Sequence, residues 1–191
     1  MYNYVFWSTQ LDVNFCNLTA LNGVKNSLDL HKGLPMKNFP KNASFAMDPN
    51  FPKAIKLADC VHNLGRHIVV SKRLKEFIKK TAPPKVEYLP VSIINHKGKI
   101  ASRDYFILNP VGVEDCIDLD KSDIQWNALD PEKISACFEM VIDEKRITHG
   151  ATIFRLKYYP TKVLVKRELA DMILAGDFIG IHFIEIEDLE Y

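Results

Sequence analysis

Two stretches of the chain follow the same plan, in which an apolar run leads directly into an amphipathic segment. These stretches are residues 68–78 and 163–173. In each, three apolar residues are spaced at i, i+3 and i+4, which places them on one face of a helix. They are Leu74, Phe77 and Ile78 in the first stretch and Leu169, Met172 and Ile173 in the second. Because an apolar helix face must be covered by another element, the spacing predicts two strand–helix–strand units whose helices pack on a sheet.

The residues at the ends of both helices fit this interpretation. The Ser71 hydroxyl can accept a hydrogen bond from an unpaired backbone N–H at the start of the first helix, whereas Lys166 offers no oxygen at the matching position. Pro83-Pro84 is expected to end the first helix and Gly176 the second. The strands that follow are expected at Val86–Ile94 and Ile179–Ile186. Whether the likeness is a repeat or a coincidence, both units build core and carry no chemistry.

The rest of the chain is expected to form strands joined by polar turns. Asn95–Lys99 reads as a turn, so Val86–Ile94 and Tyr105–Leu108 are expected to pair as antiparallel strands. Asn22–Pro52 is rich in Asn, Lys, Gly and Pro and is expected to be a loop with short elements. Further strands are expected at Tyr4–Trp7, Ile134–Ile142 and Ile153–Tyr159. The fold class is therefore α+β, with a mixed, largely antiparallel sheet and a few short helices.

Length and composition indicate one ordinary globular domain. We expect residues 1–191 to form a single domain in which residues 1–55 are an N-terminal extension or subdomain. Hydrophobic residues make up 47% of the chain, which excludes a disordered protein. No apolar run approaches the roughly 20 residues of a membrane span, and Met1–Gln10 does not resemble a secretory signal. Since Cys16, Cys60, Cys116 and Cys137 form no CxxC pair, we expect reduced, mostly buried thiols in a cytoplasmic protein.

The net charge of +1 conceals an asymmetry between the two halves of the chain. Residues 1–95 carry 13 Lys and Arg against 6 Asp and Glu, a net charge of +7, and residues 96–191 carry 12 against 18, a net charge of −6. This asymmetry favours surfaces of opposite sign that would steer a charged partner. The plainer explanation is that the charges of the two halves mingle in the fold. Basic residues and aromatics do not interleave strongly enough to predict nucleic-acid binding.

A tract of carboxylates just after the apolar strand that ends at Asn109-Pro110 is the strongest candidate for a functional surface. Its acidic residues are Glu114, Asp115, Asp118, Asp120 and Asp123. Trp126 follows closely, and Trp side chains concentrate binding energy at protein interfaces. We therefore predict that these residues and Trp126 bind a protein partner. For Trp126, a buried ring that anchors a loop is the alternative.

The acidic tract does not have the full pattern of a calcium loop. Asp118, Asp120 and Ser122 alternate as calcium ligands do. However, Asp123 stands at the sixth position, where Gly is needed, and Leu129 at the twelfth, where Glu is needed. We therefore expect a solvated loop and no metal site.

The sequence contains no motif that points to catalysis or to a cofactor. GxSxG, Walker and GxGxxG patterns are absent from it. His62 and His67 lack the i, i+4 spacing of a helical zinc pair. A Cys–His nucleophile pair stays open, because such partners meet only in the fold. We expect neither a cofactor nor an enzyme activity.

Five segments occur in an order that is characteristic when taken together. They are VVSKRLKEFI (69–78), VEYLPV (86–91), YFILNPVGVEDCIDLDKS (105–122), IFRLKYYPTKVLVKREL (153–169) and GIHF (180–183). Over roughly residues 60–187, this order resembles the eleventh numbered immunity family of bacterial polymorphic-toxin systems. Asp115, Asp118 and Ser122 match the D-x-x-D-x-x-x-S part of the family pattern. Lys166 stands where a Ser would complete the likeness to Ser71.

The resemblance implies an α+β immunity protein in the cytoplasm of the bacterium that produces the toxin. Such a protein neutralises its cognate toxin by stoichiometric binding, and the toxin is often encoded by the adjacent gene and delivered by contact-dependent secretion. On this reading the acidic tract with Trp126 would contact the toxin. The acidic residues near the end of the sequence are a second candidate surface; they are Glu185, Glu187, Asp188 and Glu190.

Two other functions stay open at this point. An adaptor or chaperone that loads an effector onto a secretion apparatus would also bind a neighbour-encoded protein, but it would leave the toxin active. An enzyme would instead require polar side chains that converge in a pocket.

Overall fold

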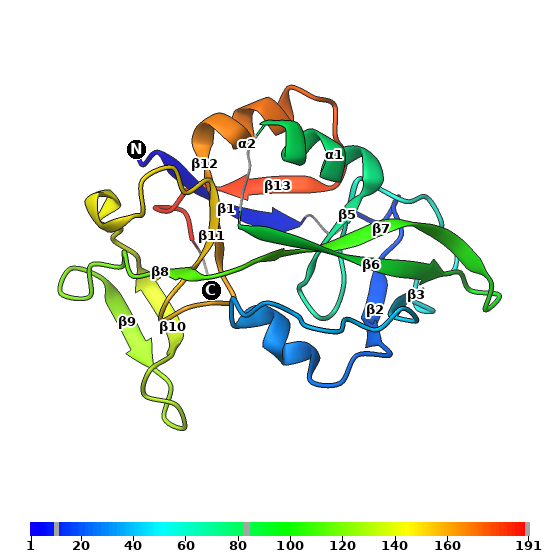
Figure 1. Cartoon of the computed structure of the whole chain (residues 1–191), viewed down its shortest axis with the longest axis horizontal. Coiled ribbons are helices and arrows are strands. Elements are labelled where there is room, and N and C mark those ends of the chain that lie inside the picture. Colours follow the sequence, from blue (N-terminus) through cyan, green and yellow to red (C-terminus); the bar gives the residue numbers. More distant parts are fainter. Residues whose placement is uncertain (10–11, 82–84, 190–191) are drawn as a thin grey trace.

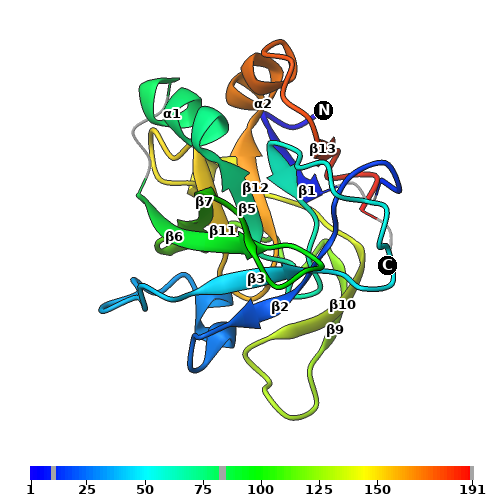
Figure 2. The ribbon, with the colours of Figure 1, turned by 90° about the vertical axis from the view of Figure 1, so that its right-hand side faces the viewer.

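The computed structural model describes residues 1–9, 12–81 and 85–189, which form two large mixed sheets and a separate hairpin (Figures 1 and 2). The five-stranded sheet has the order β13 (Ile181–Ile184), β1 (Tyr4–Thr9), β12 (Val163–Lys166), β11 (Ile153–Leu156) and β8 (Val113–Glu114). The six-stranded sheet has the order β2 (Leu18–Asn22), β3 (Ser44–Met47), β6 (Val86–Ile94), β7 (Ile100–Pro110), β5 (Ile68–Ser71) and β4 (Cys60–Val61). The hairpin consists of β9 (Asp123–Trp126) and β10 (Ile134–Glu139).

Most neighbouring strands run antiparallel, which confirms the predicted fold class. Only β11–β8 and β3–β6 pair in parallel among the named strands of the described residues. The strand predicted at Val86–Ile94 has those bounds as β6, and it pairs antiparallel with β7 through contacts such as Leu89 opposite Ile107. The strands predicted at Ile134–Ile142, Ile153–Tyr159 and Ile179–Ile186 are shorter than expected, since β10, β11 and β13 end at Glu139, Leu156 and Ile184.

Both predicted strand–helix–strand units are present. Helix α1 (Lys72–Thr81) follows β5 without a break, and α2 (Arg167–Leu174) follows β12 in the same way. The two helices lie side by side on one side of the molecule (Figures 1 and 2). Their apolar faces share one core cluster with β5 and β12. Two short 3₁₀ helices, η1 (Ser27–His31) and η2 (Glu144–Arg146), complete the described helical elements.

The sequence placed Met172 on the buried face of α2, and this prediction is wrong. Met172 is 37% exposed, whereas Ala170 is 2% exposed and belongs to the shared core. The buried residues of α2 therefore fall at i, i+1 and i+4 from Leu169, so the helix is turned about its axis relative to the expected face. A small Ala at the contact allows this turn, because it lets the helix approach its neighbours closely.

The helix ends differ between the two units in the way the sequence indicates. The Ser71 hydroxyl accepts a hydrogen bond of 3.2 Å from the Leu74 N–H, while the Lys166 side chain makes no capping bond. Helix α2 ends at Leu174, two residues before Gly176, and the left-handed residue there is Asp177 with a φ of 53°. Pro83-Pro84, predicted to end α1, lies outside the described residues.

The first part of the chain takes part in both large sheets. Strand β1 lies between β12 and β13, and β2 and β3 form one end of the six-stranded sheet. The loop predicted at Asn22–Pro52 contains η1 and β3, as short elements within it. A single domain over the whole chain stays a prediction. Within the described segments, neither α1 nor α2 is long and apolar enough to cross a lipid bilayer.

Candidate partner-binding surface

The β9–β10 hairpin projects from one end of the molecule, apart from the two large sheets (Figure 1). One side of it packs on a core cluster through Ile134 and Cys137, which are buried, and Ile124, which is partly buried. Its remaining surface carries large apolar side chains that solvent reaches: Trp126 is 40% exposed, Phe138 63% and Leu129, in the connecting turn, 97%. An exposed group of this kind marks a candidate interaction surface.

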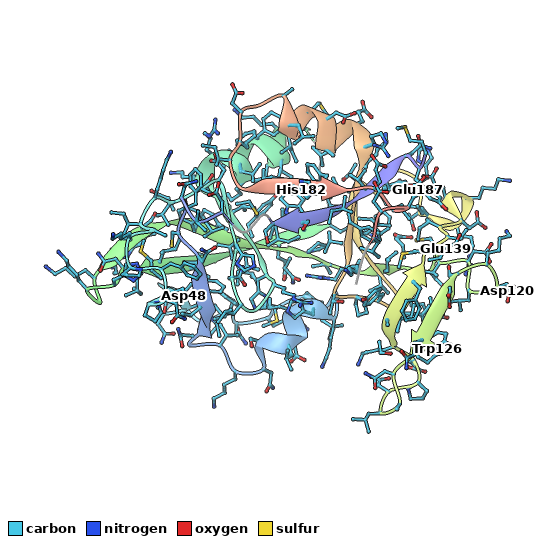
Figure 3. The ribbon with its side chains drawn as sticks, turned by 180° about the vertical axis from the view of Figure 1, so that it is seen from behind. Asp48, Asp120, Trp126, Glu139, His182 and Glu187 are labelled. Carbon is cyan, nitrogen blue, oxygen red and sulfur yellow. The ribbon has the colours of Figure 1, made fainter. Side chains whose placement is uncertain are left out.

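Two carboxylates face each other across this hairpin. Asp123 in β9 is directly opposite Glu139 in β10, and both side chains are exposed. Like charges in directly opposite positions destabilise a pair of strands. Neither carboxylate forms a salt bridge with a residue in the described part of the chain. Figure 3 shows Glu139, Asp120 and Trp126 at the same end of the molecule.

Trp126 is both packed against a neighbouring ring and exposed to solvent. Its ring packs edge-to-face against Tyr158, with 5.7 Å between the ring centroids. This contact anchors the indole, while 40% of the residue stays exposed. A ring that is held in place and still exposed loses little conformational freedom on binding, which favours its use at an interface.

The other predicted site residues are held by contacts within the chain. One Glu114 carboxylate oxygen accepts hydrogen bonds from the Thr148 N–H at 3.0 Å and the Thr148 hydroxyl at 2.9 Å. The Asp115 carboxylate pairs with Arg146 at 3.1 Å and with Lys157 at 2.8 Å. These bonds tie the loop after β8 to segments far along the chain.

Asp118 and Ser122 also make contacts that shape the loop. The Asp118 carboxylate lies 2.7 Å from the Lys121 ammonium, which holds the pKa of that carboxyl below its ordinary value. The Ser122 hydroxyl donates to the Asp118 carbonyl at 2.7 Å and accepts from the Val141 N–H at 3.0 Å. Of the residues predicted to bind a partner, the structure therefore groups Asp120, Asp123 and Trp126 with the hairpin and gives Glu114, Asp115 and Asp118 internal partners.

A cleft of about 320 Å³ adjoins the hairpin and connects it to the second predicted surface. Phe138 and Glu139 line it from β10, and Ile186 and Glu187 line it from the segment after β13. Of the other acidic residues predicted there, Glu185 forms an ion pair of 2.5 Å with Arg167, and Glu190 lies outside the described residues. Sequence reasoning missed Phe138 and Glu139, because the strand has no regular polar–apolar alternation that would mark them as exposed.

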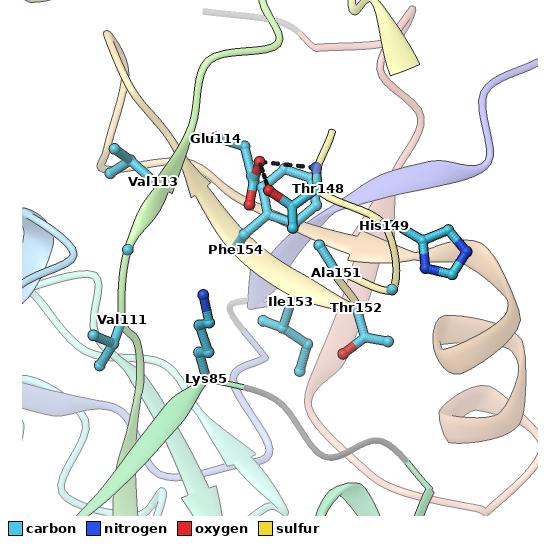
Figure 4. Close-up of a pocket in the computed structure, with 12 residues that line it drawn as sticks. Lys85, Val111, Val113, Glu114, Thr148, His149, Ala151, Thr152, Ile153 and Phe154 are labelled. Atoms are coloured by element: carbon cyan, nitrogen blue, oxygen red, sulfur yellow. Dashed lines mark hydrogen bonds between the residues drawn. The ribbon is translucent and has the colours of Figure 1, made fainter. Parts of the chain in front are cut away.

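A second cleft, of about 310 Å³, opens beside Glu114 (Figure 4). Lys85, the residue before β6, reaches into it, while the His149 ring points away from it. Glu114 is bound to Thr148 at its rim. No three His, Cys, Asp or Glu side chains of the described segments stand close enough together to hold a metal ion.

All four cysteines are buried, in agreement with the sequence prediction. Burial raises the pKa of the Cys16 thiol to about 11 and that of Cys60 and Cys116 to about 12. A thiol must ionise to act as a nucleophile, so these three are poorly suited to a Cys–His pair.

Comparison with known proteins gives one finding. The sequence pattern of the Immunity protein family (Imm11) matches residues 7–188, which include both helices, the hairpin and β2 and β3 in the N-terminal segment. No curated protein matches the sequence of this chain. Because the match extends over nearly the entire chain and agrees with the order of motifs along it, the chain belongs to the Immunity protein family (Imm11).

Proposed function

We propose that this protein binds a cognate bacterial toxin and neutralises it by stoichiometric protein–protein inhibition, without catalysis. Membership of an immunity protein family supports this proposal. The protein would act in the cytoplasm of the producing bacterium, against a toxin encoded by the adjacent gene and delivered by contact-dependent secretion. The raised thiol pKa values described above also favour binding over a thiol-dependent reaction.

The toxin-binding surface that we propose is the exposed part of the hairpin together with the loop that precedes it. It comprises Asp120, Asp123, Trp126, Leu129, Phe138 and Glu139. The observation that carries the proposal is the Asp123–Glu139 pair, two exposed like charges placed opposite each other. A basic surface on the toxin would relieve their repulsion, and the exposed apolar side chains would supply buried area. Carboxylates placed in this way could cover a basic active site or mimic the phosphates of a nuclease substrate.

The size of the protein is sufficient for the affinity that immunity requires. A dissociation constant near 1 nM corresponds to about 12 kcal/mol of binding free energy. Interfaces of this strength commonly bury about 800 Å² on each partner. The chain exposes 10761 Å², so such an interface would occupy less than a tenth of its surface.

Co-expression with the product of the adjacent gene tests the function itself. We expect cells to survive the toxin and the two proteins to co-purify as a stable complex. Co-purification without survival would instead favour an adaptor that loads an effector, because an adaptor leaves the toxin active. If neither survival nor a complex is observed, neutralisation by direct binding is wrong for this pair.

Charge reversal tests the proposed surface. We expect Asp123→Lys combined with Glu139→Lys to weaken binding at low salt, and the difference from the unaltered protein to shrink as salt screens the charges. Asp104→Lys is the matched control, since Asp104 is exposed in β7 of the six-stranded sheet, from which the hairpin is separate. Unchanged affinity and unchanged salt dependence in the double variant would show that the toxin binds elsewhere.

A further inference from the structure

A cleft of about 280 Å³ opens where the two large sheets meet. One wall is the turn before β5, which contributes His62, Arg66 and His67. The other wall comes from the end of β1 and from the turn before β12, which contributes Tyr159 and Lys162. The cleft therefore lies at the points where the strands of the two strand–helix–strand units begin.

The charged groups around this cleft are all basic. Arg66 and Lys162 line it, and no Asp or Glu is among the described residues of its walls. Arg155 is close by in β11: it is only 5% exposed, and its Nη1 donates to the carbonyl of Pro160 at 2.7 Å. The Arg155 Nε has no hydrogen-bond partner, and no carboxylate of the described segments pairs with this guanidinium. A buried cation without a counter-ion costs several kcal/mol of stability.

Burial lowers the pKa values of the neighbouring ionisable groups, and nearby positive charge lowers them further. Burial, His31 and Arg155 lower the pKa of His67 to about 3, and burial and Arg66 lower the pKa of His62. Burial lowers the pKa of Lys162, and Arg66 lowers it further. Each of these groups is therefore harder to protonate than in water, and the nearby cations add to the effect of burial.

The turn that carries Arg66 is held in a strained form. Arg66 has a φ of 54°, and every other described residue with positive φ is Gly, Asn or Asp. The buried Asn63 amide donates to the His67 carbonyl at 2.7 Å and accepts from the His67 N–H at 3.0 Å, which fixes the turn. Backbone strain of this kind clusters at functional sites.

We propose that this cleft binds a small ligand that carries a phosphate group. Arg66 and Lys162, which line the cleft from opposite walls, supply the charge that attracts the phosphate group. The buried Arg155 adds to the attraction through its field. The volume of about 280 Å³ lies just below the usual range for small-molecule sites, about 300–1,000 Å³, which fits a single phosphate with a small substituent. This proposal does not depend on toxin binding.

Titration of the full-length chain with inorganic phosphate tests the site. At constant ionic strength set with NaCl, we expect saturable binding to one site and a rise in Tm that chloride alone does not produce. Arg66→Gln and Lys162→Gln should each weaken phosphate binding at least tenfold, which is about 1.4 kcal/mol. Arg103→Gln, an exposed control in β7, should leave it unchanged.

A second variant separates binding from folding. Glycine adopts positive φ without strain, so Arg66→Gly should raise the Tm of the ligand-free chain while it weakens phosphate binding. A purely structural Arg66 would not give these opposite changes. The proposal is overturned if phosphate binds no better than chloride at equal ionic strength, or if Arg66→Gln and Arg66→Gly bind phosphate as tightly as the unaltered chain.

Discussion

Gly180 lies at a point where the backbones of the two large sheets come into contact, and its replacement by Ala should be severely destabilising. Its φ is +85°, and an added Cβ would lie 2.1 Å from the Cys60 carbonyl oxygen and 2.9 Å from the Ala58 Cβ. Next to it, the Ile179 carbonyl accepts a hydrogen bond of 3.0 Å from the Cys60 N–H. The new Cβ cannot fit unless this contact opens.

The size of the effect follows from two contributions. A non-glycine residue at positive φ costs about 1–2 kcal/mol. Moving the backbone away from Cys60 adds the loss of a buried hydrogen bond, about 1 kcal/mol, together with disrupted packing around Ala58. We therefore expect Gly180→Ala to lower the free energy of unfolding by at least about 3 kcal/mol.

Gly98→Ala is the matched control for this substitution. Gly98 lies in the β6–β7 turn with a φ of +70°, but its added Cβ would meet nothing within 4 Å. It should cost only the conformational strain, about 1–2 kcal/mol. Urea unfolding followed by circular dichroism gives both values. Equal losses for the two variants would refute the argument from close backbone contact.

Three further predictions concern the cap, the buried histidine and the number of folding units. Ser71→Ala should lower the free energy of unfolding by about 1–2 kcal/mol, because it removes the cap of α1, and Ser71→Thr should retain most of it in the same urea assay. Because the pKa of His67 is lowered to about 3 from 6.5, the unfolded chain binds a proton that the folded chain does not. Protonation of His67 in the unfolded chain should therefore leave the free energy of unfolding unchanged above pH 6.5 and lower it by at most about 1.4 kcal/mol per pH unit as the pH falls from 6.5 toward 3. His67→Gln should make the free energy of unfolding less dependent on pH between pH 6 and 5. If the chain is a single domain, Trp7 in β1 and Trp126 in the hairpin should report the same unfolding midpoint when each is the only Trp; two midpoints would contradict it.

The local parts of the fold could be predicted because short-range signals determine them. The Ser71 cap and the spacing of Leu74 and Ile78 specify α1 within ten residues of sequence, and both predictions are confirmed. The division of the strands into two sheets was not predicted, because pairing across the chain has no comparable local signal. Strand β1, for example, pairs with β12 and β13, more than 150 residues later.

The sequence predicted which types of residue form the candidate site. It did not predict which other residues of the chain these side chains contact. The carboxylate of Asp115 looks available in the sequence, but Arg146 and Lys157, 31 and 42 residues further on, reach it in the fold. Glu139 lies well outside the acidic tract and joins it only through the register of the hairpin. Such contacts depend on tertiary structure, so the sequence alone could not separate the paired carboxylates from the exposed ones.

Two positions where this chain departs from local rules lie in the two sites that we propose. Gly180 follows the rule: its backbone has positive φ, a side chain there would collide with backbone, and the residue is glycine. At Arg66 the backbone needs the same left-handed conformation, yet a long cation stands there, facing a basic cleft. At Asp123 the chain places a carboxylate opposite Glu139 when a Lys would stabilise the hairpin. Conflicts between a residue and its local structure are expected mainly where function requires that residue. The strain at Arg66 and the repulsion at Asp123 therefore support a binding role for both residues more strongly than exposure or charge alone.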